Sequence, residues 1–178
     1  PERLTVYGLT RSQAVSTYGT LTGMAMPFVL FPSALVNSLA VVLLPSTARH
    51  QSAGNTSGIA DGISMSFRYS LYLGIFCIGV FTVFGETLGL QIFKSQDAGS
   101  FIQILAWLCP FLYLATSSGS ILNGLGRTKL TFFHHLVSLL VRIAFVWFGI
   151  PVFGIRSCLW GMLASEVLLA LLHILALR

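Results

Sequence analysis

Two side chains with formal charge, Arg142 and Glu166, lie inside long apolar runs of this 178-residue chain. An ionised group within a lipid bilayer costs several kcal/mol unless it is paired or hydrated. Arg142 precedes the turn at residues 151–156 by about as many residues as Glu166 follows it, so on antiparallel neighbouring helices the two would lie at about the same depth. The spacing therefore predicts an ion pair that holds a helix bundle together. Two alternatives stay open: Arg142 contacts an anionic group in a central cavity, or the two side chains never meet.

Three uncharged polar residues, Ser33, Asn37 and Asn123, are further candidates for lining such a cavity. Ser33 and Asn37 are four residues apart, which places them on one face of a helix. They could face the same interior as Arg142, or they could form hydrogen bonds to a neighbouring helix. Asn123 ends an apolar run and begins a short polar turn.

The elements that must position these residues are predicted to be transmembrane helices. Hydrophobic residues make up 55% of the chain, charged residues only 8%, and the mean hydropathy is +0.85. A helix needs about 20 apolar residues to cross the hydrocarbon core. Five runs are long enough, at about 21–45, 67–93, 101–122, 130–150 and 157–177, with Pro151 ending the fourth. We expect an all-α, multi-pass protein of the cell membrane, with residues 1–178 forming a single membrane domain.

Prolines and small polar residues interrupt the predicted helices. Pro27, Pro32 and Pro110 should each kink a helix, because proline removes a backbone hydrogen bond. The run of small polar residues at 116–120 should pack against another helix or line a wet cavity. The polar segment 46–66 is expected to lie in water or at the interface, with its second half as an amphipathic helix.

Basic residues concentrate at the ends of the apolar runs, where they can meet lipid phosphates. The net charge of +5 therefore indicates membrane topology, and we expect no nucleic-acid partner. Arg127 and Lys129 form a basic turn after Asn123. Among the connections between the predicted helices, those on the same side of the membrane as this turn carry more Lys and Arg than those on the other side. This excess places the turn in the cytoplasm.

No residue pattern points to an enzyme, a cofactor or a metal. The three cysteines are far apart in the sequence, and no catalytic motif is present. His134 and His135 are adjacent, so they should point in different directions on a helix, and His50 and His173 stand alone. Glu86, near the end of the second run, is expected to be an interfacial carboxylate or, alternatively, an ion or substrate contact.

Four stretches resemble the stage V sporulation protein B and polysaccharide-biosynthesis branch of the multidrug/oligosaccharidyl-lipid/polysaccharide exporter superfamily. They are TGMAMPFVLFPSALVNSLAVVLLP, FRYSLYLGIFCIGVF, AGSFIQILAWLCPFLYLATSSGSILNGLGRTK and FGIRSCLWGMLASEVLLALLHIL. The resemblance implies a fragment of the C-terminal bundle of a MATE-like transporter fold, with an N-terminal bundle of the same protein as its partner. It also implies a flippase that moves a lipid-linked oligosaccharide or a peptidoglycan precursor on an undecaprenyl carrier across the cytoplasmic membrane by alternating access. In that mechanism the three prolines would be flexing points, and Arg142 would help to attract a pyrophosphate.

One feature departs from the pattern of the related lipid II flippases. Those proteins tend to carry arginines early in the helix equivalent to the first run, where this chain has Tyr18, Thr20 and Thr22. Arg142 is then expected to be the only full positive charge that this chain offers to a central cavity. The alternative function is a cation-coupled multidrug exporter of the same fold, which needs a carboxylate in the membrane, either Glu166 or Glu86.

Overall fold

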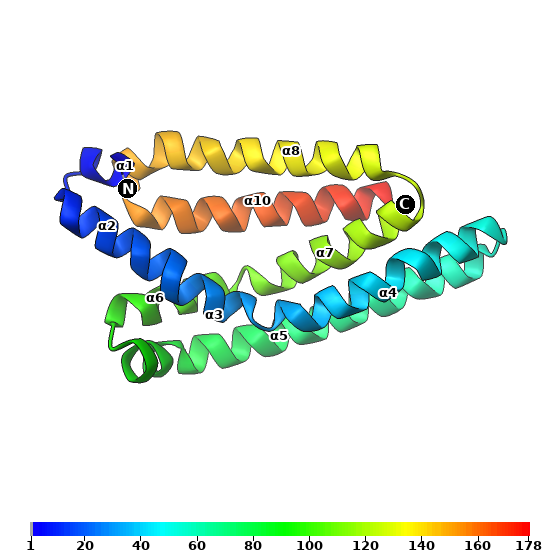
Figure 1. Ribbon diagram of the computed structural model, residues 1–178, viewed down its shortest axis with the longest axis horizontal. Coiled ribbons are helices and arrows are strands. Elements are labelled where there is room, and N and C mark those ends of the chain that lie inside the picture. Colours follow the sequence, from blue (N-terminus) through cyan, green and yellow to red (C-terminus); the bar gives the residue numbers. More distant parts are fainter. Residues whose placement is uncertain (1) are drawn as a thin grey trace.

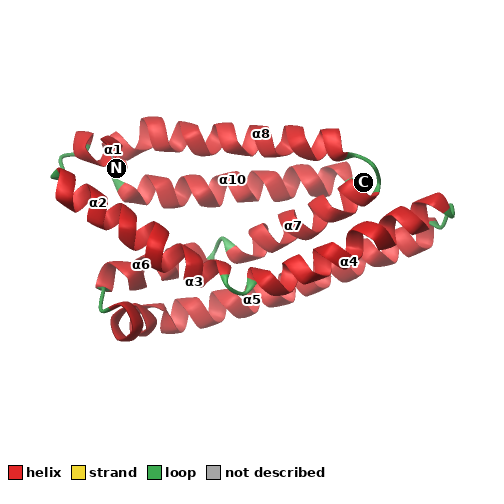
Figure 2. Cartoon of the chain, in the orientation of Figure 1, coloured by secondary structure: helices red, strands yellow, loops and turns green. Residues whose placement is uncertain are grey.

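The computed structural model describes residues 2–178, and these residues form helices joined by short turns (Figure 1; Figure 2). The elements in order are α1 (Glu2–Val6), α2 (Arg11–Thr20), the π-helical turn η1 (Leu21–Ala25), α3 (Met26–Leu30), α4 (Ser33–Ser52), α5 (Thr56–Phe93), α6 (Gln96–Ala106), α7 (Cys109–Gly124), α8 (Thr128–Ala144), a second π-helical turn η2 (Phe145–Gly149), α9 (Ile150–Phe153) and α10 (Ile155–Ala176).

Two helical hairpins flank a central helix. Helices α4 and α5 form one long pair, α8 and α10 form the other, and α7 packs against α4, α5 and α10 (Figure 1). The C-terminus lies beside the turn that joins α7 to α8, whereas the N-terminal helix α1 contacts α9 at the opposite end of the second hairpin. Helix α7 therefore connects the two halves of the bundle.

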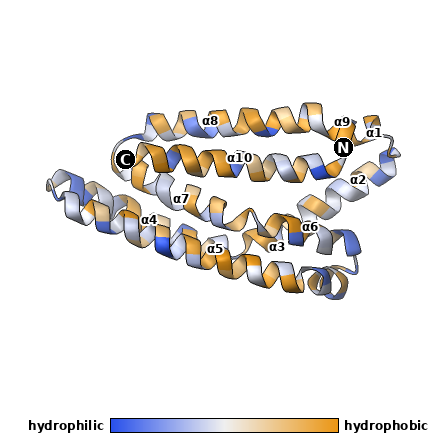
Figure 3. Ribbon diagram, turned by 180° about the vertical axis from the view of Figure 1, so that it is seen from behind, coloured by the Kyte–Doolittle hydropathy of each residue, from blue (hydrophilic) through white to orange (hydrophobic). Residues whose placement is uncertain are grey.

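The prediction of an all-helical membrane protein is confirmed. Three continuous segments are long and apolar enough to cross a membrane, namely Thr56–Phe93, Thr128–Phe153 and Ile155–Ala176. Two bent pairs of helices bring the number of candidate spans in the described residues to as many as five. Hydrophobic residues predominate along the ribbons of α8 and α10 (Figure 3). Phe133 and Leu140 on α8 and Phe148 on η2 are all exposed, as expected for side chains in contact with lipid.

Both bends occur where proline prevents a regular helix. The first pair, Arg11–Leu30 and Ser33–Ser52, bends by 55° around Phe31 and Pro32. The second pair, Gln96–Ala106 and Cys109–Gly124, bends by 52°, and Pro110 lies in the first turn of α7 just after the break. Proline lacks the N–H that would continue the helical hydrogen bonds, so the chain changes direction at these points.

Two connections differ from the expected ones. In the segment 46–66, α4 continues to Ser52 and α5 begins at Thr56, so a tight turn at Gly54, with φ of 66°, joins them. Helix α5 then runs through 38 residues, about 57 Å at 1.5 Å per residue, so part of it extends beyond a hydrocarbon core of about 30 Å.

The fourth span also continues past Pro151, and it ends at Gly154, whose φ of 63° and ψ of −148° favour glycine.

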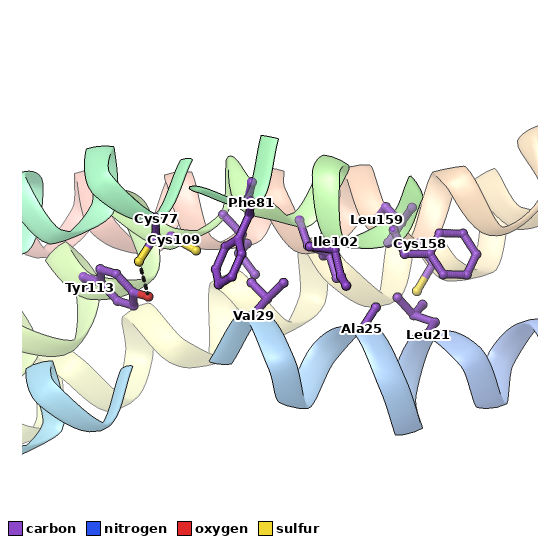
Figure 4. Packing of buried hydrophobic residues seen from close by; sticks show 14 of the residues in the cluster. Leu21, Ala25, Val29, Cys77, Phe81, Ile102, Cys109, Tyr113, Cys158 and Leu159 are labelled. Carbon is purple, nitrogen blue, oxygen red and sulfur yellow. Dashed lines mark hydrogen bonds between the residues drawn. The ribbon is translucent and has the colours of Figure 1, made fainter. Parts of the chain in front are cut away.

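The buried core lies where α3, α5, α6 and the start of α7 meet (Figure 4). The hydroxyl of Tyr113 donates to the sulfur of Cys77 at 3.6 Å, and Phe81, Val29 and Ile102 fill the neighbouring space. Cys77, Cys109 and Cys158 are all free and buried.

Glycines allow the helices to approach closely. A Cβ at Gly74 would lie 2.5 Å from the Cα of Pro110, and a Cβ at Gly89 would overlap the backbone of Gly99. Helix α5 can therefore lie directly against α6 and α7 only because these positions lack side chains.

Candidate functional site

Arg142 on α8 and Glu166 on α10 form an ion pair. Because α8 and α10 are antiparallel and joined at Gly154, residues at equal distances from that turn lie side by side. The Nη2 of Arg142 donates to the Oε1 of Glu166 at 2.7 Å, and its Nε donates to the Oγ of Ser165 at 3.0 Å. One helical turn away, the Oγ of Ser138 donates to the backbone carbonyl of Ser165 at 2.9 Å. The pair is therefore held in place by hydrogen bonds from both helices.

The two charged side chains differ in their exposure. The side chain of Arg142 is 35% exposed and that of Glu166 is 12% exposed. The carboxylate is thus enclosed, while part of the guanidinium remains free for another partner. Among residues 2–178 this is the one salt bridge that the structure contains.

A cavity of about 560 Å³ opens on the face of the pair between α7, α8 and α10, and we call it the inner cavity. Its polar lining consists of Thr116, Ser120, Asn123, His135, Ser138, Arg142 and Glu166. Part of the small polar tract 116–120 therefore lines this cavity. The tract also packs against other helices: the hydroxyls of Ser117 and Ser70 lie 3.0 Å apart, and Ser120, which lines the cavity as well, donates to the backbone carbonyl of Ala40.

A second cavity, of about 1030 Å³, lies between the N-terminal helices and the α8–α10 hairpin, and we call it the arginine-lined cavity. Arg3, Arg11 and Arg142 all line it, with Glu2 as the acidic residue among its lining side chains. The guanidinium carbon of Arg3 lies 3.5 Å from the ring centroid of Trp147, a cation–π contact that holds this side chain over η2.

This arrangement corrects the expectation that Arg142 would be the only positive charge in a cavity. The N-terminal helix α1 packs on α9, and Arg3 lines the same cavity as Arg142. Tyr18 and Thr22, which stand where the related flippases tend to carry arginines, line the same cavity. Besides Arg142, the positive charge comes from Arg3 and Arg11 in the N-terminal helices.

The remaining candidates occupy different places. Asn123 accepts a hydrogen bond from the hydroxyl of Thr131 at 2.7 Å and lines the inner cavity. Asn37 is exposed, and the hydroxyl of Ser33, at the start of α4, donates to the carbonyl of Leu30 at the end of α3. Neither of these two lines either cavity. Both residues lie on α4, which belongs to the other hairpin from the helix of Arg142.

In the basic turn, the Nη1 of Arg127 donates to the carbonyl of Ala176 at 2.6 Å, while Lys129 is exposed. Arg127 thus caps the C-terminal end of α10, where unpaired carbonyls attract a cation. Glu86 is exposed on α5, and within residues 2–178 it makes no ion pair.

The structure corrects the expectation that His173 stands alone. Its ring centroid lies 5.2 Å from that of His134 and 5.6 Å from that of His135. The sequence contains the signal: His135 and Arg142 are seven residues apart, as are Glu166 and His173. The antiparallel register that joins the charged pair therefore also brings these histidines together. In the described part of the chain no group of three His, Cys, Asp or Glu side chains is arranged to hold a metal ion.

Comparison with known proteins gives two relatives of this chain. It is 25% identical to Stage V sporulation protein B of Bacillus subtilis over 174 residues, which cover 97% of this chain and 34% of the relative. It is 26% identical to Sporulation protein YkvU of the same organism over 171 residues, covering 93% of this chain and 38% of that relative. No protein-family model and no solved structure matches significantly.

The chain thus spans about a third of the length of the two curated relatives. The two matches extend over nearly the whole of this chain. The resemblance deduced from the sequence motifs is confirmed as distant homology: this multi-pass membrane chain is related along nearly its full length to Stage V sporulation protein B and Sporulation protein YkvU.

Proposed function

We propose that this chain is part of a flippase that moves an undecaprenyl-linked glycan or peptidoglycan precursor across the cytoplasmic membrane. The N-terminal bundle of the same protein would form the other wall of the substrate pathway, and membrane lipid would surround both. The two bundles would rock against each other, with the helix bends at Pro32 and Pro110 as flexing points.

The observation that carries this proposal is the arginine-lined cavity. Arg3, Arg11 and Arg142 line a space of about 1030 Å³, which is in the size range of small-molecule binding sites. Guanidinium groups bind phosphate oxygens through paired hydrogen bonds, and several around one space suit a pyrophosphate better than a cation. Apolar side chains such as Val146 and Met162 complete the lining, as a lipid-linked substrate requires.

The ion pair argues against the cation-coupled exporter. That function needs a carboxylate that is free to bind Na⁺ or H⁺, and Glu166 is engaged by Arg142 at 2.7 Å. Glu86 is exposed on the outer face of α5 rather than in either cavity. The positive charge around the arginine-lined cavity would also repel a cationic drug.

Depletion of the full-length protein from the cells that produce it tests the proposal. We expect pyrophosphate-linked lipid glycans to accumulate on the inner leaflet, measured by their accessibility to an impermeant reagent in inverted and right-side-out vesicles. Re-expression of the wild-type protein should restore the distribution. Cells that keep a normal distribution but retain cationic drugs would instead contain the exporter, and the flippase proposal would be wrong.

A further inference from the structure

The inner cavity and the arginine-lined cavity follow one another along one face of the span formed by α8, η2 and α9. The inner cavity is lined from His135 to Arg142, and the arginine-lined cavity from Arg142 to Ile150. Between these limits Leu139 and Val146 continue the series at intervals of three or four residues, the spacing of one helix face. From His135 to Ile150 this face extends over about 22 Å at about 1.5 Å per residue.

Helix α10 shows the same order on its side of the hairpin. Ile155, Cys158 and Met162 line the arginine-lined cavity, and Glu166 and Leu169 line the inner cavity. These positions also recur at intervals of three or four residues. Both helices therefore present one continuous face to the two cavities, which meet at the ion pair. A ligand longer than one cavity can follow this face past Arg142.

The two cavities differ in charge. Three arginines and one glutamate line the arginine-lined cavity. The formally charged residues that line the inner cavity are Arg142 and Glu166, which neutralise each other across 2.7 Å. The first cavity therefore suits an anionic group, whereas the second suits a polar group without net charge.

The inner cavity offers hydrogen-bond acceptors and donors together. The hydroxyls of Thr116 and Ser138 each donate to a backbone carbonyl, at 2.8 and 2.9 Å, so their oxygen lone pairs are left for a ligand. The amide oxygen of Asn123 accepts from the hydroxyl of Thr131 at 2.7 Å, which leaves the two amide N–H groups as donors. Arg142 uses its Nε and Nη2 to hold the neighbouring helix, and its Nη1 carries further N–H groups.

A sugar has the chemistry that matches this lining. Its hydroxyl and acetamido groups carry no charge, and they both donate and accept hydrogen bonds. Its C–H groups can pack against the aliphatic part of the lining, which includes Leu112, Leu139 and Leu169. The volume of about 560 Å³ lies in the size range of small-molecule sites. An acyl chain in the same space would leave the polar groups without partners, which is costly.

We propose that the inner cavity binds the sugar that is attached to the pyrophosphate of a lipid-linked substrate. This inference rests on the proposed function, which assigns the pyrophosphate to the arginine-lined cavity. Because sugar and pyrophosphate are covalently joined, their sites must be adjacent, and the two cavities share Arg142. Recognition would then be divided, with charge selecting the pyrophosphate and neutral hydrogen bonds selecting the sugar.

Calorimetric titration of the purified full-length protein in lipid nanodiscs tests the proposal with two probes. One is undecaprenyl pyrophosphate, and the other is the same lipid carrying one N-acetylglucosamine. We expect the wild type to bind the sugar-bearing lipid at least about fivefold more tightly, the effect of one or two neutral hydrogen bonds. Thr116→Val keeps the shape of the side chain but removes its hydroxyl, so it should lose most of this gain and bind undecaprenyl pyrophosphate as the wild type does.

Asn123→Leu, which removes the amide donors, should reduce the same gain. The matched control is Thr87→Val, because Thr87 is exposed on α5 and lines neither cavity. It should bind both lipids with the wild-type affinities.

The wild-type titrations decide the matter even if a variant fails to fold. Equal affinities of the wild type for the two lipids would overturn the sugar site and leave the proposed function standing. An equal loss of affinity for both lipids in Thr116→Val would also overturn it. If the wild type binds neither lipid, the proposed function is wrong, and the sugar site is wrong with it.

Discussion

The guanidinium of Arg142 lies 2.7 Å from the carboxylate of Glu166, and Arg142 lines both the inner cavity and the arginine-lined cavity. The carboxylate lines the inner cavity alone. Under the proposed function, Arg142 would have two alternative partners: Glu166, as in the structure, and an anionic group of the substrate in the arginine-lined cavity. Competition between them offers a simple way to join substrate binding to the packing of α8 on α10.

The ion pair should contribute to stability as a coupled unit. Arg142→Ala leaves an enclosed carboxylate without a partner, and we expect it to lower the free energy of unfolding by about 2 kcal/mol, between the values for exposed and buried pairs. Glu166→Ala in that background should cost little more. The coupling is measured by thermal unfolding of the full-length protein in detergent, with the two single variants and the double variant.

Arg156→Ala is the matched control for this cycle, because Arg156 is exposed at the start of the same helix α10. It should change stability by less than about 0.5 kcal/mol. The charge swap Arg142→Glu with Glu166→Arg should recover most of the lost stability. Strictly additive effects of the two alanine substitutions would mean that the pair contributes nothing.

The close approach of α5 to α6 should depend on Gly89. Gly89→Ala places a Cβ against the backbone of Gly99. This backbone cannot move aside as the end of a flexible side chain could. We expect a loss of about 1–3 kcal/mol in unfolding free energy, as for other overpacked sites. Gly79 on the same helix has open space around it, so Gly79→Ala should instead be neutral or stabilising by up to about 1 kcal/mol. Equal effects of the two substitutions on the unfolding temperature would contradict the packing described.

The basic turn should stabilise the end of α10 through Arg127 rather than through charge in general. Arg127→Gln removes the charged donor to the carbonyl of Ala176, and hydrogen exchange in the last turn of α10 should become up to about fivefold faster, equivalent to about 1 kcal/mol. Lys129→Gln removes the same charge from a nearby exposed position and should leave the exchange unchanged. Faster exchange in both variants would point to a general effect of charge.

The sequence predicted those parts of the fold that depend on local pattern. The apolar runs predicted the helices, and the prolines predicted the bends. The equal distances of Arg142 and Glu166 from one turn predicted that the two residues lie at the same depth. The end of the fourth span was misplaced because proline fits the first turn of a helix, so the chain runs on from Pro151 to Gly154. In the segment 46–66 the second half is helical as expected, because the cap at Asn55 starts α5 at Thr56, but the first half is helical as well, since α4 continues to Ser52.

Contacts between distant segments were not predictable in the same way. The approach of Arg3 to the cavity depends on how α1 packs against α9, and periodicity carries no information about that. Ser33 and Asn37 share a helix face as expected, but only the direction of the bend at Pro32 decides which side of the bundle they occupy. The meeting of His134 with His173 follows from the register of the ion pair, so it was present in the sequence.

The most direct test of the proposed function is the rate at which the purified full-length protein, in lipid vesicles, translocates an undecaprenyl-pyrophosphate-linked sugar. The decisive variant is the charge swap Arg142→Glu with Glu166→Arg, which keeps the ion pair but removes the positive charge from position 142. If Arg142 binds the pyrophosphate, the folded swap variant should translocate at least about tenfold more slowly than the wild type, because it loses one charge-assisted hydrogen bond to the substrate. The control variant Arg156→Gln should translocate at the wild-type rate. A swap variant as fast as the wild type would contradict a substrate role for Arg142 and reduce the ion pair to a structural contact.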